Sequence, residues 1–105
     1  RLGEGWIAEE ALAIGVYCAL KATDFRHGLV LAINHSGDSD STGSITGNIL
    51  GAWGGMEVIP SDLLVELELR PVIDTLACDL HDHATWTFAR ARKGGHQPWT
   101  RYPSR

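Results

Sequence analysis

The residues best suited to chemistry lie in one short polar segment, residues 35–43, which reads HSGDSDSTG. Within it Asp38 and Asp40 stand two residues apart, and Ser41 and Thr42 follow directly. Two carboxylates and neighbouring hydroxyls in one turn can supply several hard oxygen ligands, which Mg²⁺, Ca²⁺ and Mn²⁺ prefer. The same spacing also suits a helix N-terminus, where aspartate caps free backbone N–H groups. Spacing alone therefore leaves a metal site and a charged helix cap as alternatives.

An EF-hand calcium loop is the most specific cation motif to test on this segment. Asp38, Asp40, Thr42 and Gly43 fall at loop positions 1, 3, 5 and 6, as an EF-hand requires. Position 12 should hold a bidentate glutamate, and here it is Ile49. The ligand that closes the site is missing, so the sequence excludes an EF-hand.

A second group of possible ligands lies near the C-terminus: Asp79, His81, Asp82 and His83, followed by His96. On a helix, residues two apart point about 200° away from each other. His81 and His83 could therefore share a Zn²⁺ ion only in a strand or loop. A solvated polar helix face is the alternative interpretation.

Helical periodicity dominates the chain, and no strand pattern persists. Asp24 is placed to cap one helix and Ser61 another. We expect an all-α fold of four or five helices, over residues 6–21, 25–34, 41–53, 61–70 and 72–91. The polar segment would then run directly into the N-terminus of the third helix.

Gly43, Gly47 and Gly51 recur every four residues on one face of this third helix. Each glycine in a helix interior costs roughly 1 kcal/mol relative to alanine. That cost predicts the close approach of another element along this face. Membrane helix dimers use the same spacing, but the polar Ser44 and Asn48 and the short length argue against a membrane helix.

The chain has 105 residues, 44% hydrophobic and 21% charged, which is the composition of one globular domain. This composition excludes a disordered acidic chain, a disulfide scaffold and a collagen-like repeat. No apolar run reaches the ~18 residues of a membrane span. Cys18 and Cys78 lie in apolar helical contexts, where buried free thiols are expected. Because the N-terminus shows neither a secretory signal nor an initiator methionine, we expect a cytoplasmic protein and a processed or excised piece.

Charge is distributed unevenly along the chain. All 13 acidic residues precede residue 90, whereas residues 90–105 carry only basic ones. An acidic body repels phosphates, so we do not expect nucleic acid as a partner. Residues 94–105 are expected to form a basic irregular tail.

Two separate segments resemble motifs of the ADP-ribosylglycohydrolase family. Residues 34–43 (NHSGDSDSTG) and 47–52 (GNILGA) resemble the C-terminal metal motif of that family. Residues 3–14 (GEGWIAEEALAI) resemble an upstream motif, in the family's order and at about its spacing. The family includes the ADP-ribosyl-arginine hydrolases and the dinitrogenase reductase-activating glycohydrolases. The resemblance covers roughly residues 2–70.

The resemblance implies an all-α fold with a binuclear Mg²⁺ centre, in which Mn²⁺ sometimes replaces Mg²⁺. By position, Asp38, Asp40 and Ser41 would be metal ligands, and Asp38 and Asp40 would also count as catalytic residues. Thr42 would then be a helix-start residue.

The resemblance also suggests where substrate binds. The family's glycine-aromatic loop lies near the adenosine end of ADP-ribose, which makes Gly3, Gly5 and Trp6 candidate substrate-binding residues. Trp6 has a second interpretation as a core anchor. Glu9 and Glu10 are interpreted as an acidic first helical turn and not as catalytic groups.

The implied reaction is hydrolysis of the bond that joins ADP-ribose to an acceptor, either a modified protein or a small molecule. The family's remaining metal ligands come from an N-terminal Thr-Asp-Asp motif and a separate acidic residue, and this sequence has no Thr-Asp-Asp. Residues 1–93 therefore resemble only the C-terminal portion of the catalytic domain. The N-terminal remainder or another chain would complete the centre, so we expect weak Mg²⁺ binding and no hydrolysis by this chain alone. The alternative is a non-catalytic helical fragment or pseudoenzyme module that binds ADP-ribose or a partner protein.

Overall fold

The computed structural model of the chain describes the backbone of residues 2–89 and the side chains of residues 2–82. Over this range the fold is all-helical, as the periodicity predicts. The elements are α1 (Ala8–Lys21), α2 (Phe25–Ile33), α3 (Ser39–Gly54), the 3₁₀ turn η1 (Met56–Val58), α4 (Ser61–Val65) and α5 (Arg70–Ala89). None of these helices is long and apolar enough to cross a membrane.

The chain divides into two compact units, Arg1–Glu66 and Leu67–Arg105. The first contains α1 to α4, and the second contains α5. The expected domain end at residue 93 and the basic tail over residues 94–105 lie outside the described residues.

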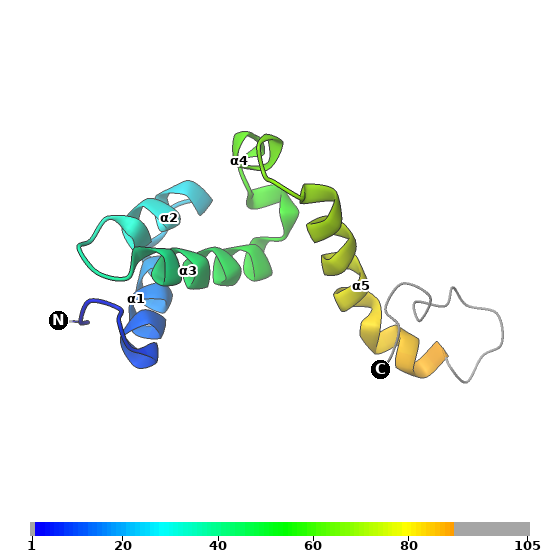
Figure 1. Ribbon diagram of the computed structural model, residues 1–105, viewed down its shortest axis with the longest axis horizontal. Helices are drawn as coiled ribbons and strands as arrows, with labels where there is room; N and C mark the ends of the chain where they lie inside the picture. Colours follow the sequence, from blue (N-terminus) through cyan, green and yellow to red (C-terminus); the bar gives the residue numbers. More distant parts are fainter. Residues whose placement is uncertain (1, 90–105) are drawn as a thin grey trace. The chain divides into compact units, whose positions relative to one another are not determined.

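The first unit is organised around α3, which packs against both α1 and α2 (Figure 1). Few apolar side chains in the described residues are buried, and several of them are small. They are Ala11, Ile14, Cys18, Ala32 and Leu50. Burial stabilises a fold by roughly 25 cal/mol for each Å² of apolar surface removed from water, so these side chains form only a modest core.

Small residues bring the helices of this unit close together. A methyl group added at Gly43 would lie 2.8 Å from Cγ2 of Ile33 on α2, and one at Gly47 would lie 3.4 Å from Cδ2 of Leu29. The predicted close approach is therefore confirmed at these two positions. It is wrong at Gly51, where nothing lies within 4 Å.

The caps of α2 and α4 differ in how well the sequence predicts them. The backbone N–H of His27 donates to Oδ1 of Asp24 at 2.8 Å, which confirms Asp24 as the cap of α2. Ser61 is not a cap. It is the first residue of α4, and Pro60 occupies the cap position without a side-chain hydrogen bond.

The fourth helix is shorter than the sequence predicts, because α4 ends at Val65. Leu69 has a φ of +57°, a left-handed conformation that an α-helix cannot include. Its carbonyl accepts the N–H groups of Val72 and Ile73 at 2.9 and 3.0 Å, so a new helix begins there. Pro71 is the second residue of α5, where its fixed φ and missing N–H are tolerated.

Both cysteines are free thiols, as predicted, but only Cys18 is buried. Burial raises the pKa of the Cys18 thiol above its ordinary value, which keeps it protonated and unreactive at neutral pH. The expectation that Cys78 is buried is wrong, because it is exposed on α5. The apolar periodicity of that segment forms a helix face that is not buried within the described residues.

Gly15 and Gly51 offer a matched test of helix packing. A methyl group at Gly15 would lie 2.5 Å from Cγ2 and 2.9 Å from Cβ of Ile45, atoms close to the backbone of α3. We expect Gly15→Ala to lower the free energy of unfolding by about 1–3 kcal/mol through overpacking. Gly51→Ala should raise it by up to about 1 kcal/mol, since alanine favours helix and meets no neighbour. Chemical denaturation of both variants measures this difference, and equal effects would contradict the packing of α1 on α3.

Candidate functional site

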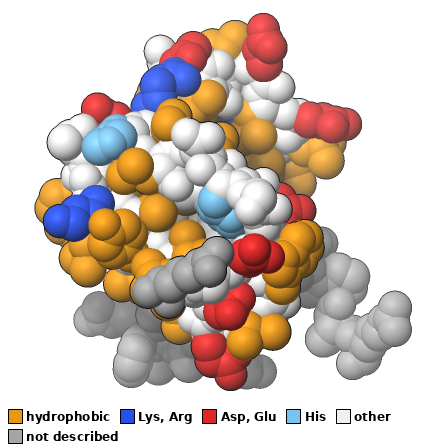
Figure 2. All heavy atoms as spheres, turned by 90° about the vertical axis from the view of Figure 1, so that its left-hand side faces the viewer, with side chains coloured by type: hydrophobic (Ala, Val, Ile, Leu, Met, Phe, Trp, Pro, Cys, Tyr) orange, Lys and Arg blue, Asp and Glu red, His pale blue; other side chains and the backbone are white. Residues whose placement is uncertain are grey.

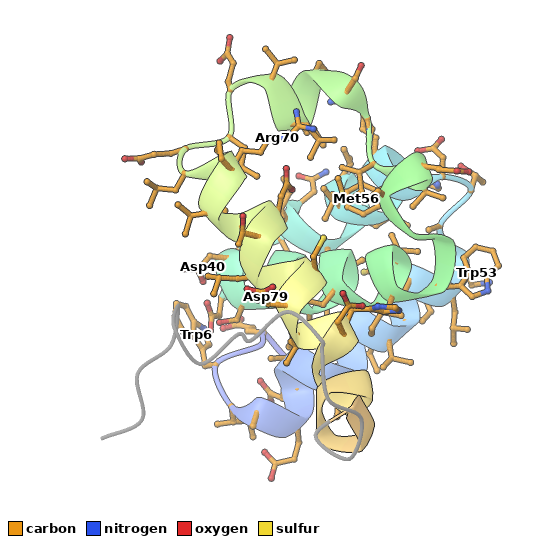
Figure 3. The ribbon with its side chains drawn as sticks, turned by 90° about the vertical axis from the view of Figure 1, so that its right-hand side faces the viewer. Trp6, Asp40, Trp53, Met56, Arg70 and Asp79 are labelled. Carbon is orange, nitrogen blue, oxygen red and sulfur yellow. The ribbon has the colours of Figure 1, made fainter. Side chains whose placement is uncertain are left out.

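The segment that carries the possible metal ligands forms the turn from α2 into α3. Asp38 occupies the N-cap position of α3 and is half-buried, while Asp40 and Ser41 lie in the first helical turn. The structure thus extends the helix two residues further toward the N-terminus than the sequence predicts. Figure 3 shows Asp40 at the end of α3 opposite Trp53. All three predicted ligands come from a single turn.

The side chains of this turn interact with one another. A hydrogen bond that the protonated Asp40 side chain can donate to Asp38, and then one from Ser41, hold the pKa of the Asp38 carboxyl below its ordinary value. The Asp40 carboxylate in turn accepts the backbone N–H of Ser41 at 2.7 Å. Asp38 is therefore ionised at neutral pH, and it stays ionised to a lower pH than an ordinary aspartate does.

This donor set fits part of a divalent-cation site. Two carboxyl groups and a hydroxyl provide hard oxygen atoms within hydrogen-bonding reach of each other, and a cation would offset the repulsion between the carboxylates. A shallow hollow of about 490 Å³ beside them is lined by Asp40, Ser41, Ser44 and Ile45. Among the described residues, no group of three histidine, cysteine, aspartate or glutamate side chains could hold a metal ion. Complete coordination would need further ligands from outside this turn.

The N-terminal glycine loop contacts the same turn. The backbone N–H of Asp38 donates to the carbonyl oxygen of Glu4 at 2.9 Å. Gly5 is buried, and a methyl group there would lie 3.0 Å from Cγ2 of Thr42 and 3.5 Å from the carbonyl oxygen of Asp38. At Gly37 an added methyl group would overlap the carbonyl of Glu4. The two segments singled out in the sequence, more than thirty residues apart, thus form one site.

Glu10 holds this loop in place, a role that the sequence analysis missed. Its Oε2 atom accepts the N–H groups of Glu4 and Gly5 at 3.1 and 3.2 Å. Gly3 and Gly5 have φ values of +86° and +84°, which only glycine adopts readily. The signal in the sequence was two such glycines directly before a helix with a carboxylate in its first turn.

Trp6 is 66% exposed, so its interpretation as a core anchor is wrong for this structure. It follows the glycine loop directly and precedes α1. Figure 3 shows Trp6 and Asp40 both toward the N-terminal end of α3. An exposed indole beside a polar turn is available to stack on a planar ligand.

A hydrogen-bonded chain that the sequence analysis also missed lies beneath the turn. The backbone N–H of Gly37 donates to Nδ1 of His35 at 3.0 Å, and Nε2 of His35 lies 2.9 Å from Oγ1 of Thr42. The Thr42 hydroxyl is fully buried and donates to the carbonyl oxygen of Ala32 at 2.6 Å. Thr42 is thus a helix-start residue, as expected, and it ties α3 to the last turn of α2.

Within the described residues, the second group of possible ligands forms no metal site. His81 and His83 both lie on α5, whose geometry directs them about 200° apart. Nδ1 of His81 lies 3.0 Å from Oδ1 of Asp82. The side chain of His83 and the whole of His96 lie outside the described residues. The described part therefore fits the solvated polar face.

A larger apolar groove lies elsewhere on the first unit. It has a volume of about 710 Å³ and is formed by α1, the start of α2, the end of α3 and η1. Leu20 and Trp53 line it and are 80% and 86% exposed. Its apolar lining also includes Val16, Ala19, Phe25, Ile49, Leu50 and Val58. Figure 2 shows hydrophobic side chains exposed on one face, the largest group of them beside a basic side chain.

Comparison with known proteins identifies the family. The sequence profile described as ADP-ribosylglycohydrolase matches residues 1–89. The chain belongs to the ADP-ribosylglycohydrolase family. No solved structure matches it significantly.

Several proteins are similar to this member of the family. It is 31% identical over 91 residues to ADP-ribosylhydrolase ARH3 of Bos taurus, a match covering 76% of this chain and 25% of the relative. It is 38% identical over 58 residues to ADP-ribosyl-[dinitrogen reductase] glycohydrolase of Rhodospirillum rubrum, covering 50% of this chain and 20% of the relative. An uncharacterised protein of Archaeoglobus fulgidus is 32% identical over 82 residues. The chain thus spans about a quarter of the length of the relatives it matches.

Glu10 and Glu9 provide a matched pair of variants that tests how the glycine loop is held in place. Glu10→Ala removes the acceptor of two backbone N–H groups, whereas Glu9→Ala removes the same charge from the same turn. Hydrogen bonds to charged groups contribute about 1.5–3 kcal/mol. We therefore expect Glu10→Ala to speed amide hydrogen exchange at Gly5 and Asp38 by about tenfold, measured by NMR. If Glu9→Ala sped this exchange equally, the loss of negative charge and not the loss of the hydrogen-bond acceptor would be the cause.

Proposed function

We propose that this chain forms part of the active site of an enzyme that hydrolyses ADP-ribosyl glycosidic bonds, and that it supplies the C-terminal half of a binuclear Mg²⁺ centre. The observation that carries the proposal is the joining of the glycine loop to the acidic turn, through the hydrogen bond from Asp38 N–H to the Glu4 carbonyl. Membership of the family and the names of its relatives support ADP-ribosyl hydrolysis as the reaction class.

Asp38, Asp40 and Ser41 would hold the metal. Their oxygen donors suit Mg²⁺, Ca²⁺ and Mn²⁺ alike, and the family resemblance favours Mg²⁺ or Mn²⁺. When bound, such an ion acts as a Lewis acid and lowers the pKa of water. The carboxylates would also offset positive charge on the ribose ring as the glycosidic bond breaks, because glycoside cleavage passes through an oxocarbenium-like transition state. The lowered pKa of Asp38 keeps it ionised for both tasks.

Gly3, Gly5 and Trp6 would bind the adenosine end of the substrate. The positive φ of both glycines gives the loop a path that other residues rarely adopt, and this loop places Trp6 with an uncovered aromatic face. The substrate would be an ADP-ribosylated protein or small molecule, as the names of the relatives suggest.

The remainder of a glycohydrolase domain, in the same polypeptide or another chain, is the proposed partner. The acidic turn offers too few ligands by itself. The open groove around Leu20 and Trp53 would be covered by the helices that complete the domain, because exposed apolar patches of this kind mark interaction sites. We propose a cytoplasmic location for the assembled protein.

A non-catalytic module that binds ADP-ribose is the second candidate. The observation that favours it is the small number of possible ligands in the described residues, combined with an intact glycine loop. In such a module the glycine loop and Trp6 would bind ADP-ribose, and no bond would be hydrolysed.

Magnesium binding tests the ligand assignment. We expect isothermal titration calorimetry to show weak binding, on the order of 10⁻⁴–10⁻³ M, the weak end for oxygen-ligand sites. Asp38→Asn and Asp40→Asn should each weaken it at least tenfold, since even outer-shell partners cost that much. Ser41→Ala should have a smaller effect, because a hydroxyl is neutral.

Asp62→Asn is the matched control for net charge. Asp62 lies in α4 and pairs with Arg26 away from the acidic turn. Its substitution should leave Mg²⁺ affinity within about twofold. If it weakened binding as much as Asp38→Asn, the assignment of the ligands would be wrong.

Complementation tests the hydrolase activity and the groove together. We expect this chain alone to release no ADP-ribose from ADP-ribosylated arginine peptides. Mixed with the part of the Rhodospirillum rubrum glycohydrolase that lies outside the match, it should gain Mg²⁺-dependent turnover. Leu20→Glu in the groove should reduce that turnover more than tenfold, because it buries a charge at the contact.

Val65→Glu is the control, since Val65 is 76% exposed but does not line the groove. Turnover by this chain alone that is lost on Asp38→Ala would contradict a shared centre. Binding of ADP-ribose with no turnover in the mixture would favour the non-catalytic module.

A further inference from the structure

His35 lies at the base of the turn that presents Asp38, and both of its ring nitrogens are engaged. Nδ1 accepts the backbone N–H of Gly37 at 3.0 Å, and Nε2 lies 2.9 Å from Oγ1 of Thr42. The ring is half-buried. The hydrogen bonds of the other described histidines, His27 and His81, are made through Nδ1.

These partners determine which nitrogen carries the proton. A backbone N–H can only donate, so Nδ1 must be unprotonated. In the neutral ring Nε2 then carries the hydrogen and donates it to Thr42 Oγ1. The Thr42 hydroxyl still has its own proton for the Ala32 carbonyl at 2.6 Å. The carbonyls of Asp38 and Ser39 lie farther from this hydroxyl, at 3.1 and 3.2 Å. The contacts of the two ring nitrogens therefore fit one tautomer of the neutral ring, with the hydrogen on Nε2.

This chain fixes the backbone on both sides of Asp38. Gly37 precedes Asp38, and Thr42 N–H donates to the Asp38 carbonyl at 3.3 Å. A histidine that accepts the N–H two residues on imitates the turn that an asparagine side chain forms. The bond to buried Thr42 anchors the same ring to the start of α3.

We infer that His35 is a positioning residue, which as the neutral Nε2–H tautomer bridges the Gly37 amide and the Thr42 hydroxyl and so fixes the turn that presents Asp38 to the metal. The inference rests on the proposed metal centre. It assigns His35 no contact with substrate or metal.

Two conservative variants separate the two hydrogen bonds. His35→Asn keeps an acceptor for the Gly37 N–H but is too short to reach Thr42. His35→Gln can donate an amide hydrogen to Thr42 but cannot accept the Gly37 N–H at the same time. Because each of these variants breaks one bond of the bridge, we expect both His35→Asn and His35→Gln to weaken Mg²⁺ binding, each by less than His35→Ala does. His35→Ala breaks both bonds and should lose 10–100-fold, as outer-shell partners do.

His27→Ala is the matched control. His27 also accepts a backbone N–H through Nδ1, from Thr23 at 3.2 Å, but lies at the start of α2. It should leave Mg²⁺ affinity unchanged. If either His35→Asn or His35→Gln kept full Mg²⁺ affinity, or if His35→Ala had no effect, the inference would be overturned.

Nitrogen-15 NMR of the full chain gives a readout that does not depend on metal. The His35 ring should show an unprotonated Nδ1 and a protonated Nε2 at pH 7.5, and His35→Ala should speed amide exchange at Gly37 and Asp38 at least tenfold. The opposite tautomer, or unchanged exchange, would overturn the inference. Absence of Mg²⁺ binding by the unaltered chain would instead contradict the proposed function. Faster exchange with full Mg²⁺ affinity in His35→Ala would reduce His35 to a structural role and so also overturn the inference.

Discussion

The buried hydroxyl of Thr42 closes the turn between α2 and α3 by donating to the Ala32 carbonyl at 2.6 Å. This bond joins the last turn of one helix to the first turn of the next, so the residues between them have a fixed path. Asp38 occupies the N-cap position of α3 at the end of that path, and its N–H donates to the Glu4 carbonyl at 2.9 Å. The glycine loop, the acidic turn and the start of α3 therefore depend on one fully buried side chain. A buried hydroxyl without a hydrogen-bond partner would cost about 1–3 kcal/mol. Loss of one bond in the network would therefore destabilise the fold.

The sequence predicted the helices well because their signals are local. Helical periodicity, the Asp24 cap and the close contacts of Gly43 all depend on residues near each other in the chain or on one helix face. The predicted end of the fourth helix and the predicted burial of Cys78 were wrong. Leucine gives no signal for a left-handed conformation at position 69, and helical periodicity does not show whether a helix face has a packing partner.

The residue types of the candidate site could be predicted from the sequence, but the residues that hold its backbone in place could not. The Asp38–Asp40–Ser41 turn and the glycine loop could be identified from their spacing and from the family resemblance. Glu10 and His35 could not, since their roles are to accept backbone N–H groups whose positions are known only once the chain has folded. Trp6 was ambiguous for the same reason, because exposure is a property of packing.

The central claim is that the turn at the start of α3 is a divalent-cation site. Paramagnetic line broadening by Mn²⁺ tests this most directly, because broadening falls steeply with distance from the ion. We predict that small additions of Mn²⁺ to the nitrogen-15-labelled chain first broaden the amide signals of residues 38–42 and Gly5. Broadening that begins instead at residues 79–83, or that is uniform over all acidic segments, would contradict the account.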